Sequence, residues 1–219
     1  TKKNPTTFKK LTFNEEKNIS NITKSVKRST THREKRKIFR SYSFTAEYED
    51  NITLEIFVEY DKDKRKDFVK AENEAKLFAL MYGQMPHFLK IYNKKIYIHN
   101  DIDGDEDPNS NGLWWAEIQK KEFHINTIRD KNRYHRCGEK KRYSRCTLVM
   151  VHELAHIIDP GTGPIKPSQW EKARKLDKKK FASEYAKTNS DEDFAESMVS
   201  WIVVRYKPDK ISKSDLEKF

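Results

Sequence analysis

The sequence lacks any apolar run of membrane-spanning length, so no part of it is expected to cross a bilayer. Cysteine is scarce, because Cys137 and Cys146 are the only two in 219 residues and lack the spacing of a zinc knuckle. They are expected either to form a disulfide in an oxidising compartment or to remain free thiols, and the sequence leaves both open. Apolar residues make up only 35% of the chain, and the mean hydropathy is −1.00. This low share predicts that part of the chain is a solvated segment.

Positive charge is in excess, with 45 Lys and Arg against 34 Asp and Glu, a net charge of +11. A basic surface favours acidic partners, whether nucleic acid, anionic membrane or acidic protein segments. Much of the charge lies in the segment 24–40, which has few large apolar residues. We therefore predict a basic, flexible N-terminal extension over residues 1–40 and one folded domain over residues 41–219. The extension has two other interpretations, a docking arm for an acidic partner and the remnant of a pro-segment.

The order of patterns along the folded part predicts strands and a helix first, and further helices afterwards. Alternating and β-branched residues predict three strands, over 52–60, 95–100 and 122–129. Apolar residues at helical spacing predict four helices, over 67–83, 147–159, 169–186 and 191–206. This order indicates an α+β fold, with an N-terminal sheet-plus-helix part, a C-terminal helical part and a cleft between them.

The helix predicted over 147–159 contains the pattern HELAH, in which His152 and His156 are four residues apart. Residues four apart project from the same face of a helix, so the two imidazoles could hold one metal ion such as Zn²⁺. Glu153, about 100° round the helix, could then act as general base toward a water molecule. The alternative is a buried helix, since the stretch is apolar nearly all round. That alternative leaves polar groups buried without partners, which is costly.

A third metal ligand must come from elsewhere in the chain. The continuation that adds a Gly and a third His would place them where the sequence has Asp159 and Thr162, and no histidine follows the motif. The remaining candidates are Glu192 and Glu196, which lie four residues apart on the last predicted helix. Glu192 has a competing interpretation, because it follows Asn189 by three residues and fits a helix-capping box.

HELAHIID and the later EYAKTNSDEDFAESM together resemble the catalytic domain of anthrax lethal factor and the related clostridial Pro-Pro endopeptidases. In this family of zinc metallopeptidases, a Tyr follows the HExxH helix, a glutamate ligand comes seven residues later, and Phe-Ala-Glu follows. Tyr185, Glu192 and Phe194-Ala195-Glu196 repeat this order. The resemblance covers about residues 147–206, and it implies a zincin-like fold with the active-site cleft between the two parts.

The resemblance also implies a role for each residue of the site. One Zn²⁺ would be bound as in thermolysin, by two histidines and one glutamate: His152, His156 and Glu192. Glu153 would be the general base, and Tyr185 would stabilise the oxyanion. Glu196 would hydrogen-bond a ligand histidine. Asp159 would support the site, or would simply lie at the helix end before Pro160.

The function that these residues predict is hydrolysis of peptide bonds by a zinc endopeptidase of the gluzincin type. Secretion, and a toxin-like role, follow only from the resemblance, and no leader is visible in the chain. We expect a monomer that acts on polypeptides, with a preference for acidic segments because the chain is basic. The alternative is a nucleic-acid-associated zinc protein that binds through the segment 24–40. Repair-type zinc proteases complete their site with a third histidine, which this chain does not have.

Two further segments carry predictions. The loop Asp101–Asp107 holds five carboxylates around Gly104 and could bind Ca²⁺, but its spacing differs from that of an EF-hand, which favours a solvated loop. His124, Ile125 and Asn126 are predicted to pair with an extended substrate, if their strand lies at the sheet edge before the zinc helix. The alternative is an internal strand, with a neighbouring tryptophan in the core.

Overall fold

The computed structural model describes residues 7–19, 39–59, 68–99, 114–117, 121–126, 137, 143–160, 164–177 and 180–206. The strands are β1 (Phe8–Ile19), β2 (Phe39–Tyr48), β3 (Thr53–Glu59), β4 (Lys95–His99), β5 (Trp114–Glu117) and β6 (Glu122–Asn126). The helices are α1 (Phe68–Gly83), α2 (His87–Lys90), α3 (Tyr143–Ile157), α4 (Pro167–Leu176) and α5 (Ser190–Tyr206), with a 3-10 turn, η2, over Tyr185–Lys187. The fold is therefore mixed α and β, as the sequence predicts.

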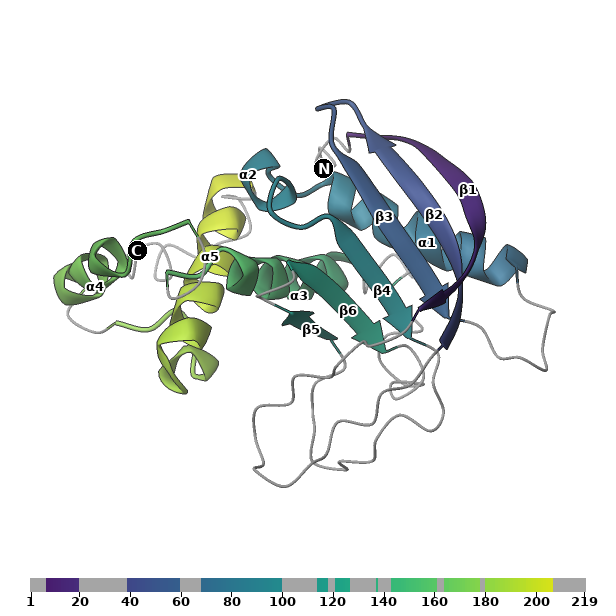
Figure 1. The fold of residues 1–219 in the computed structure, drawn as a ribbon. Coiled ribbons are helices and arrows are strands. Elements are labelled where there is room, and N and C mark those ends of the chain that lie inside the picture. The colour runs from purple at the N-terminus through teal and green to yellow at the C-terminus, as the bar shows by residue number, and fades with distance from the viewer. Residues whose placement is uncertain are drawn as a thin grey trace, which may run out of the picture.

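The strands form one sheet in the order β1-β2-β3-β4-β6-β5 (Figure 1). β1, β2 and β3 pair antiparallel, whereas β3, β4 and β6 run parallel. Helix α1 makes the crossover between β3 and β4, as a parallel connection requires. β5 pairs antiparallel with β6 and forms the edge of the sheet beside α3.

Alternation along the parallel strands creates the core. Ile56, Ile96 and Phe123 are cross-strand partners with no exposed surface, and they belong to one apolar cluster with residues of α1 and α3. The intervening residues Phe57 and Tyr97 face the other side of the sheet, where their rings stack. Because α3 packs on this sheet with its apolar residues, its polar residues are left on the side that faces α5.

Several predicted elements are confirmed with small shifts at their ends, namely β3, α1, β4 and α5. The single helix predicted over 169–186 is wrong. Helix α4 ends at Leu176, and Tyr185–Lys187 form the separate turn η2, which packs on α5 with Ala186 buried.

The prediction that residues 1–40 are a flexible extension is wrong over Phe8–Ile19. This segment is strand β1, and its register with β2 runs from Phe8 opposite Tyr48 to Ile19 opposite Phe39. Phe13 makes edge contacts with the rings of Phe44 and Phe68, so β1 contributes to packing over α1. Residues 20–38, which carry most of the basic segment, lie outside the described residues, as does the acidic loop Asp101–Asp107.

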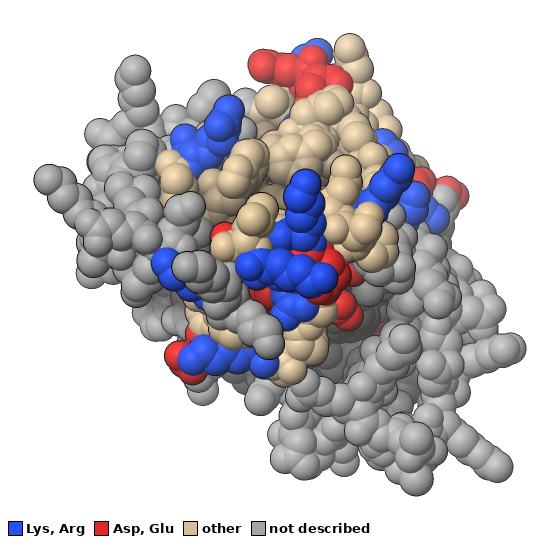
Figure 2. All heavy atoms as spheres, turned by 90° about the vertical axis from the view of Figure 1, so that its left-hand side faces the viewer, with Lys and Arg blue, Asp and Glu red and all other residues tan. Residues whose placement is uncertain are grey.

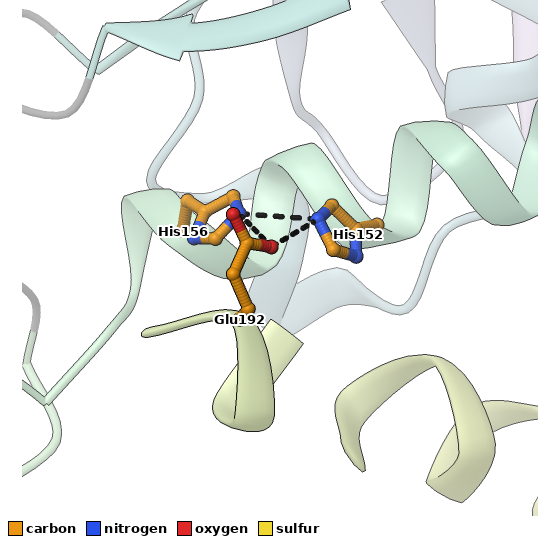
Figure 3. Close-up of side chains that lie close together, drawn as sticks. All are labelled: His152, His156 and Glu192. Atoms are coloured by element: carbon orange, nitrogen blue, oxygen red, sulfur yellow. Dashed lines mark hydrogen bonds and ion pairs between the residues drawn. The ribbon is translucent and has the colours of Figure 1, made fainter. Parts of the chain in front are cut away.

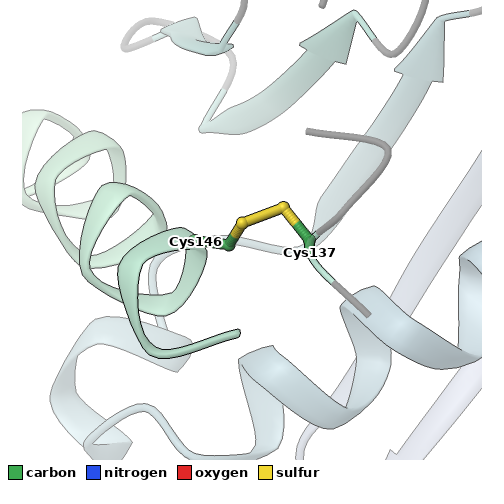
Figure 4. The surroundings of a disulfide bond; sticks show 2 residues. All are labelled: Cys137 and Cys146. Atoms are coloured by element: carbon green, nitrogen blue, oxygen red, sulfur yellow. A yellow bond between two sulfur atoms is a disulfide. The ribbon is translucent and has the colours of Figure 1, made fainter. Parts of the chain in front are cut away.

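A disulfide joins Cys137 to Cys146 in the first turn of α3, with Cα atoms 5.8 Å apart (Figure 4). Both cysteines are buried, and they lie in the same apolar cluster as the core of the sheet. Of the two possibilities that the sequence leaves open, a disulfide or two free thiols, the structure has the disulfide. None of the described helices is long and apolar enough to cross a membrane.

Candidate metal centre

Helix α3 presents both histidines of the HELAH pattern on its partly exposed face. Met150, Val151 and Leu154 of the same helix are buried in the core, which fixes how the helix is rotated. His152 and His156 are therefore held on the opposite side, toward the start of α5. Their Nε2 atoms lie 3.2 Å apart, which is the same-face arrangement that the four-residue spacing predicts.

Glu192, in the first turn of α5, completes a group of three side chains that could hold a metal ion (Figure 3). Its Oε2 atom lies 3.0 Å from Nε2 of His152 and 3.5 Å from Nε2 of His156. All three ligand atoms fall within 4.8 Å of one another, and this is the one such group among the described residues. Two segments about forty residues apart in the sequence are thus brought to a single point.

The three side chains fit a Zn²⁺ ion. Two imidazole nitrogens and one carboxylate oxygen are the protein ligands of many catalytic zinc sites. Oε2 of Glu192 is buried and has no hydrogen-bond partner of good geometry, although both histidines are beside it. A cation between the three atoms would satisfy this oxygen together with the nitrogen lone pairs. The donor set and the uncompensated oxygen therefore agree with metal binding.

Electrostatics at His152 also favour positive charge. Burial acts to lower the pKa of His152, but its close contacts with the Glu192 and Glu196 carboxylates outweigh burial and raise the pKa to about 10. Contacts with His152 and His156 hold the pKa of Glu192 well below its usual range, against the effect of burial. Because the carboxylates stabilise a cation here, a metal ion would compete with a proton for the same nitrogen.

Asn189 fixes the backbone that carries Glu192. Its Oδ1 atom accepts hydrogen bonds from the backbone N–H groups of Asp191 and Glu192, both at 2.9 Å, which is the N-cap arrangement. The Glu192 carboxylate is directed to the two histidines. The two interpretations of Glu192 are thus divided between its groups: the backbone is capped, and the carboxylate belongs to the metal group.

Glu196 makes the contact that the resemblance implies. Its Oε1 atom lies 2.8 Å from Nδ1 of His152. Since a carboxylate only accepts, Nδ1 of His152 carries the proton, and in the neutral ring the lone pair is on Nε2, the atom that faces Glu192. Glu196 therefore holds His152 in the orientation that turns its Nε2 atom toward Glu192.

Tyr185 lies at the open side of the group. Its ring is 52% exposed, and its hydroxyl donates to Oε1 of Glu192 at 3.2 Å. The ring centroid is 5.8 Å from that of His152. If the hydroxyl turns away from Glu192, it can donate its one hydrogen to a molecule that enters from solvent.

Glu153 is turned toward the edge strand. Burial raises its pKa to about 7, although His156 and His152 act to lower it. The carboxylate also accepts a hydrogen bond from the backbone of Ala116 in β5. Ala116 has no signal in the sequence, because this contact depends only on a backbone N–H and on the placement of β5. The strand Trp114–Glu117 is only four residues long, so it offers little alternation for a sequence pattern to show.

The prediction that His124, Ile125 and Asn126 bind substrate at a sheet edge is wrong. They belong to β6, which pairs with β4 on one side and with β5 on the other, so its backbone has no free edge. His124 and Ile125 are buried, and Trp114 of β5 is in the core. The internal-strand alternative therefore holds, and the edge beside α3 is β5.

Asp159 is buried just after the end of α3, and its backbone N–H donates to the carbonyl of His156. This placement agrees with the helix-end interpretation, and a supporting role at the metal group stays a prediction.

An ion pair that the sequence did not predict joins α4 to α5. Nε of Arg174 donates to Oδ2 of Asp193 at 2.9 Å, which ties α4 to the residue after Glu192. Asp193 is buried, so this charge depends on Arg174.

No family model matches this chain, and neither a curated protein nor a solved structure matches it. The function is therefore inferred from the side chains that the fold brings together.

Proposed function

We propose that this protein is a zinc-dependent endopeptidase, similar to the lethal factor family of metallopeptidases. The observation that carries the proposal is the convergence of His152, His156 and Glu192 within 4.8 Å, with Glu153 on the adjoining side of the same helix. Two histidines and a glutamate alone would also suit a structural metal site. Glu153, with its raised pKa, on the same helix as the histidines, together with the exposed Tyr185 beside Glu192, favours hydrolysis.

The fold supports the proposal in a second way. A mixed sheet lies against the helix that carries the HELAH pattern, and its antiparallel edge strand β5 lies beside that helix. We infer a zincin-like fold from this arrangement, with the active-site cleft at the boundary between the sheet and α5.

Each residue of the site has a chemical task in this mechanism. When bound, Zn²⁺ would lower the pKa of a water molecule and polarise a peptide carbonyl. Glu153 accepts the proton of the attacking water and passes it to the leaving amine, for which a pKa near neutral is well suited. Tyr185 donates a hydrogen bond to the negative charge that develops on the carbonyl oxygen. Glu196 holds His152 in one orientation throughout.

Substrate backbone would be bound by β5. An extended peptide can add to an exposed sheet edge through main-chain hydrogen bonds. The Ala116 N–H group bonded to Glu153 is on this strand, so a peptide along β5 would pass the general base. We therefore propose that β5, and not the strand of His124, Ile125 and Asn126, pairs with the substrate backbone.

We also propose that the protein is secreted. It is supported by the Cys137–Cys146 disulfide, because such bonds persist mainly in oxidising compartments.

The test compares metal content and peptidase activity in three forms of the full chain. The wild type should contain about one zinc ion per chain and should cleave members of a quenched fluorescent peptide library. Glu153→Gln should retain zinc and lose activity by about 10²–10⁴-fold, because only the general base is removed. Glu72→Gln, an exposed glutamate on α1, is the control that should change neither property.

Wild-type protein without zinc after reconstitution at neutral pH would refute the metal site. Full activity in Glu153→Gln would refute the mechanism while leaving the metal site in place.

A further inference from the structure

Helix α4 is held on the molecule by one side only. None of its residues is buried, and its attachment runs through Trp170 and Arg174. Its other side and the flanking chain expose Lys166, Lys172, Lys175 and Lys180, which we call the α4 basic surface. In the sequence, Lys178 and Lys179 extend the same run.

The acidic residues near this surface do not neutralise it. Glu171 pairs with Arg174, at 3.0 Å, and Asp193 pairs with the same guanidinium. Since these two carboxylates share one guanidinium, they leave one negative charge over, and the exposed Asp177 adds another. Against them stand the four exposed lysines, so the described residues keep a net charge of +2, and none of these lysines forms an ion pair within the described part of the chain. Like charges on one surface repel one another, and the repulsion is relieved when an anionic partner binds.

Helix α4, which carries this surface, is fixed to the helix that carries Glu192. The ring of Trp170 packs edge-on against Phe194, with centroids 5.2 Å apart, and Arg174 bonds to Asp193. Both partners lie on α5 and follow Glu192 directly in the sequence. Lys and Arg side chains gather at the centre of the face on which α4 and α5 lie, with Asp and Glu side chains directly beside them (Figure 2).

We propose that the α4 basic surface is a docking site for an acidic segment of the polypeptide substrate, outside the residues that surround the cleaved bond. This inference rests on the proposed function, because the bound polypeptide is a substrate only if the protein is a peptidase. Binding of the acidic segment itself does not depend on zinc. Exposed lysines with flexible stems suit carboxylates in an extended chain, since they need no fixed geometry. Leu176, 73% exposed at the end of α4, adds an apolar contact for a residue within that segment.

The test measures binding of a fluorescein-labelled octaglutamate peptide by fluorescence anisotropy, at low salt, in the inactive Glu153→Gln full chain. The first variant combines Lys172→Gln, Lys175→Gln and Lys180→Gln. The matched control combines Lys70→Gln, Lys76→Gln and Lys94→Gln, which removes the same charge from exposed positions outside α4. We expect the dissociation constant to rise about tenfold in the first variant and to change little in the control, with affinity falling as salt increases.

Equal losses in the two triple variants would overturn the proposal, because net charge alone would then explain binding. So would tighter binding of single-stranded DNA of the same charge through the same lysines, which would make nucleic acid the partner. In the active enzyme, an octaglutamate tail on a peptide that the library identifies should increase kcat/KM only when the three lysines are present. Cleavage that is unaffected by the tail would refute docking at the α4 basic surface and would leave the proposed peptidase activity in place. Binding of octaglutamate through the three lysines, in a protein that neither holds zinc nor cleaves peptides, would refute the proposed function and leave the binding surface in place.

Discussion

At the scale of single residues, the buried carboxylate of Glu153 lowers the folding stability of the protein at neutral and higher pH. Burial raises its pKa to about 7, so the folded state binds a proton there more tightly than the unfolded chain does. The unfolded value is near 4.5. Stability from this group is therefore fully present below about pH 4.5 and is lost as pH rises through about 7.

The Glu153→Gln variant should reverse that loss in the metal-free protein. Glutamine has no charge to bury, so we expect the variant to be more stable than the wild type at pH 8, by up to about 3 kcal/mol, and to differ little near pH 4. Urea denaturation in the presence of a chelator, followed across pH, measures this difference. An equal pH dependence in both proteins would show that Glu153 is solvated, and Glu72→Gln should reproduce the wild-type profile.

Glu192 and Glu196 are expected to differ in their effect on metal affinity. Glu192→Ala removes a ligand, whereas Glu196→Ala removes only the partner that orients His152. We expect zinc affinity to fall by about 10–100-fold in Glu196→Ala and by more in Glu192→Ala. Competition with a chromophoric chelator gives both values. The opposite order would mean that Glu196 is the ligand and Glu192 its support.

At the scale of elements, the first turn of α5 combines three tasks in consecutive residues. Asn189 caps the helix, Glu192 faces the histidines, and Asp193 anchors α4. A change in the cap should therefore reach the metal group through the backbone.

Replacing Asn189 by Ala tests this coupling. The lost cap should cost about 1 kcal/mol of folding free energy. Zinc affinity should also fall, because the N–H of Glu192 loses its partner and the position of its carboxylate becomes less well defined. Asn189→Asp keeps an oxygen at the cap and should preserve both properties. A stability loss with unchanged zinc affinity would show that the ligand is positioned by its own contacts with the histidines.

At the scale of the whole molecule, the sheet and the helical part are joined through α3, whose start is fastened by the Cys137–Cys146 disulfide. The nine-residue separation of the two cysteines makes a small loop, and chain entropy assigns such a loop a modest stabilisation.

The double variant Cys137→Ala with Cys146→Ala should lower the free energy of unfolding by about 2–3 kcal/mol. Reduction of the wild type under denaturing conditions, followed by refolding in reductant, should give a similar loss. Denaturation curves with and without reductant measure it, and the double variant should not respond to reductant. A wild-type curve that is the same in both conditions would mean that the two thiols are not joined in solution.

The sequence by itself determined the elements whose signals are local. The four-residue spacing placed His152 and His156 on one face, and alternation located β3 and β4. The α+β class followed from the order of these patterns. Such signals survive in a single sequence because helical and strand periods depend only on neighbouring residues.

Only the tertiary structure decided which distant groups meet. The capping signal at Glu192 is local and equally compatible with a surface helix, and it took the packing of α5 on α3 to direct its carboxylate to the histidines. The strand order shows that the edge of the sheet is β5 and not β6. The sequence could not show this, because the residue pattern of one strand does not reveal which strand pairs with it. Strand β1 was missed for the same reason: its polar residues suit an edge strand as well as a solvated arm, and only its register with β2 distinguishes the two.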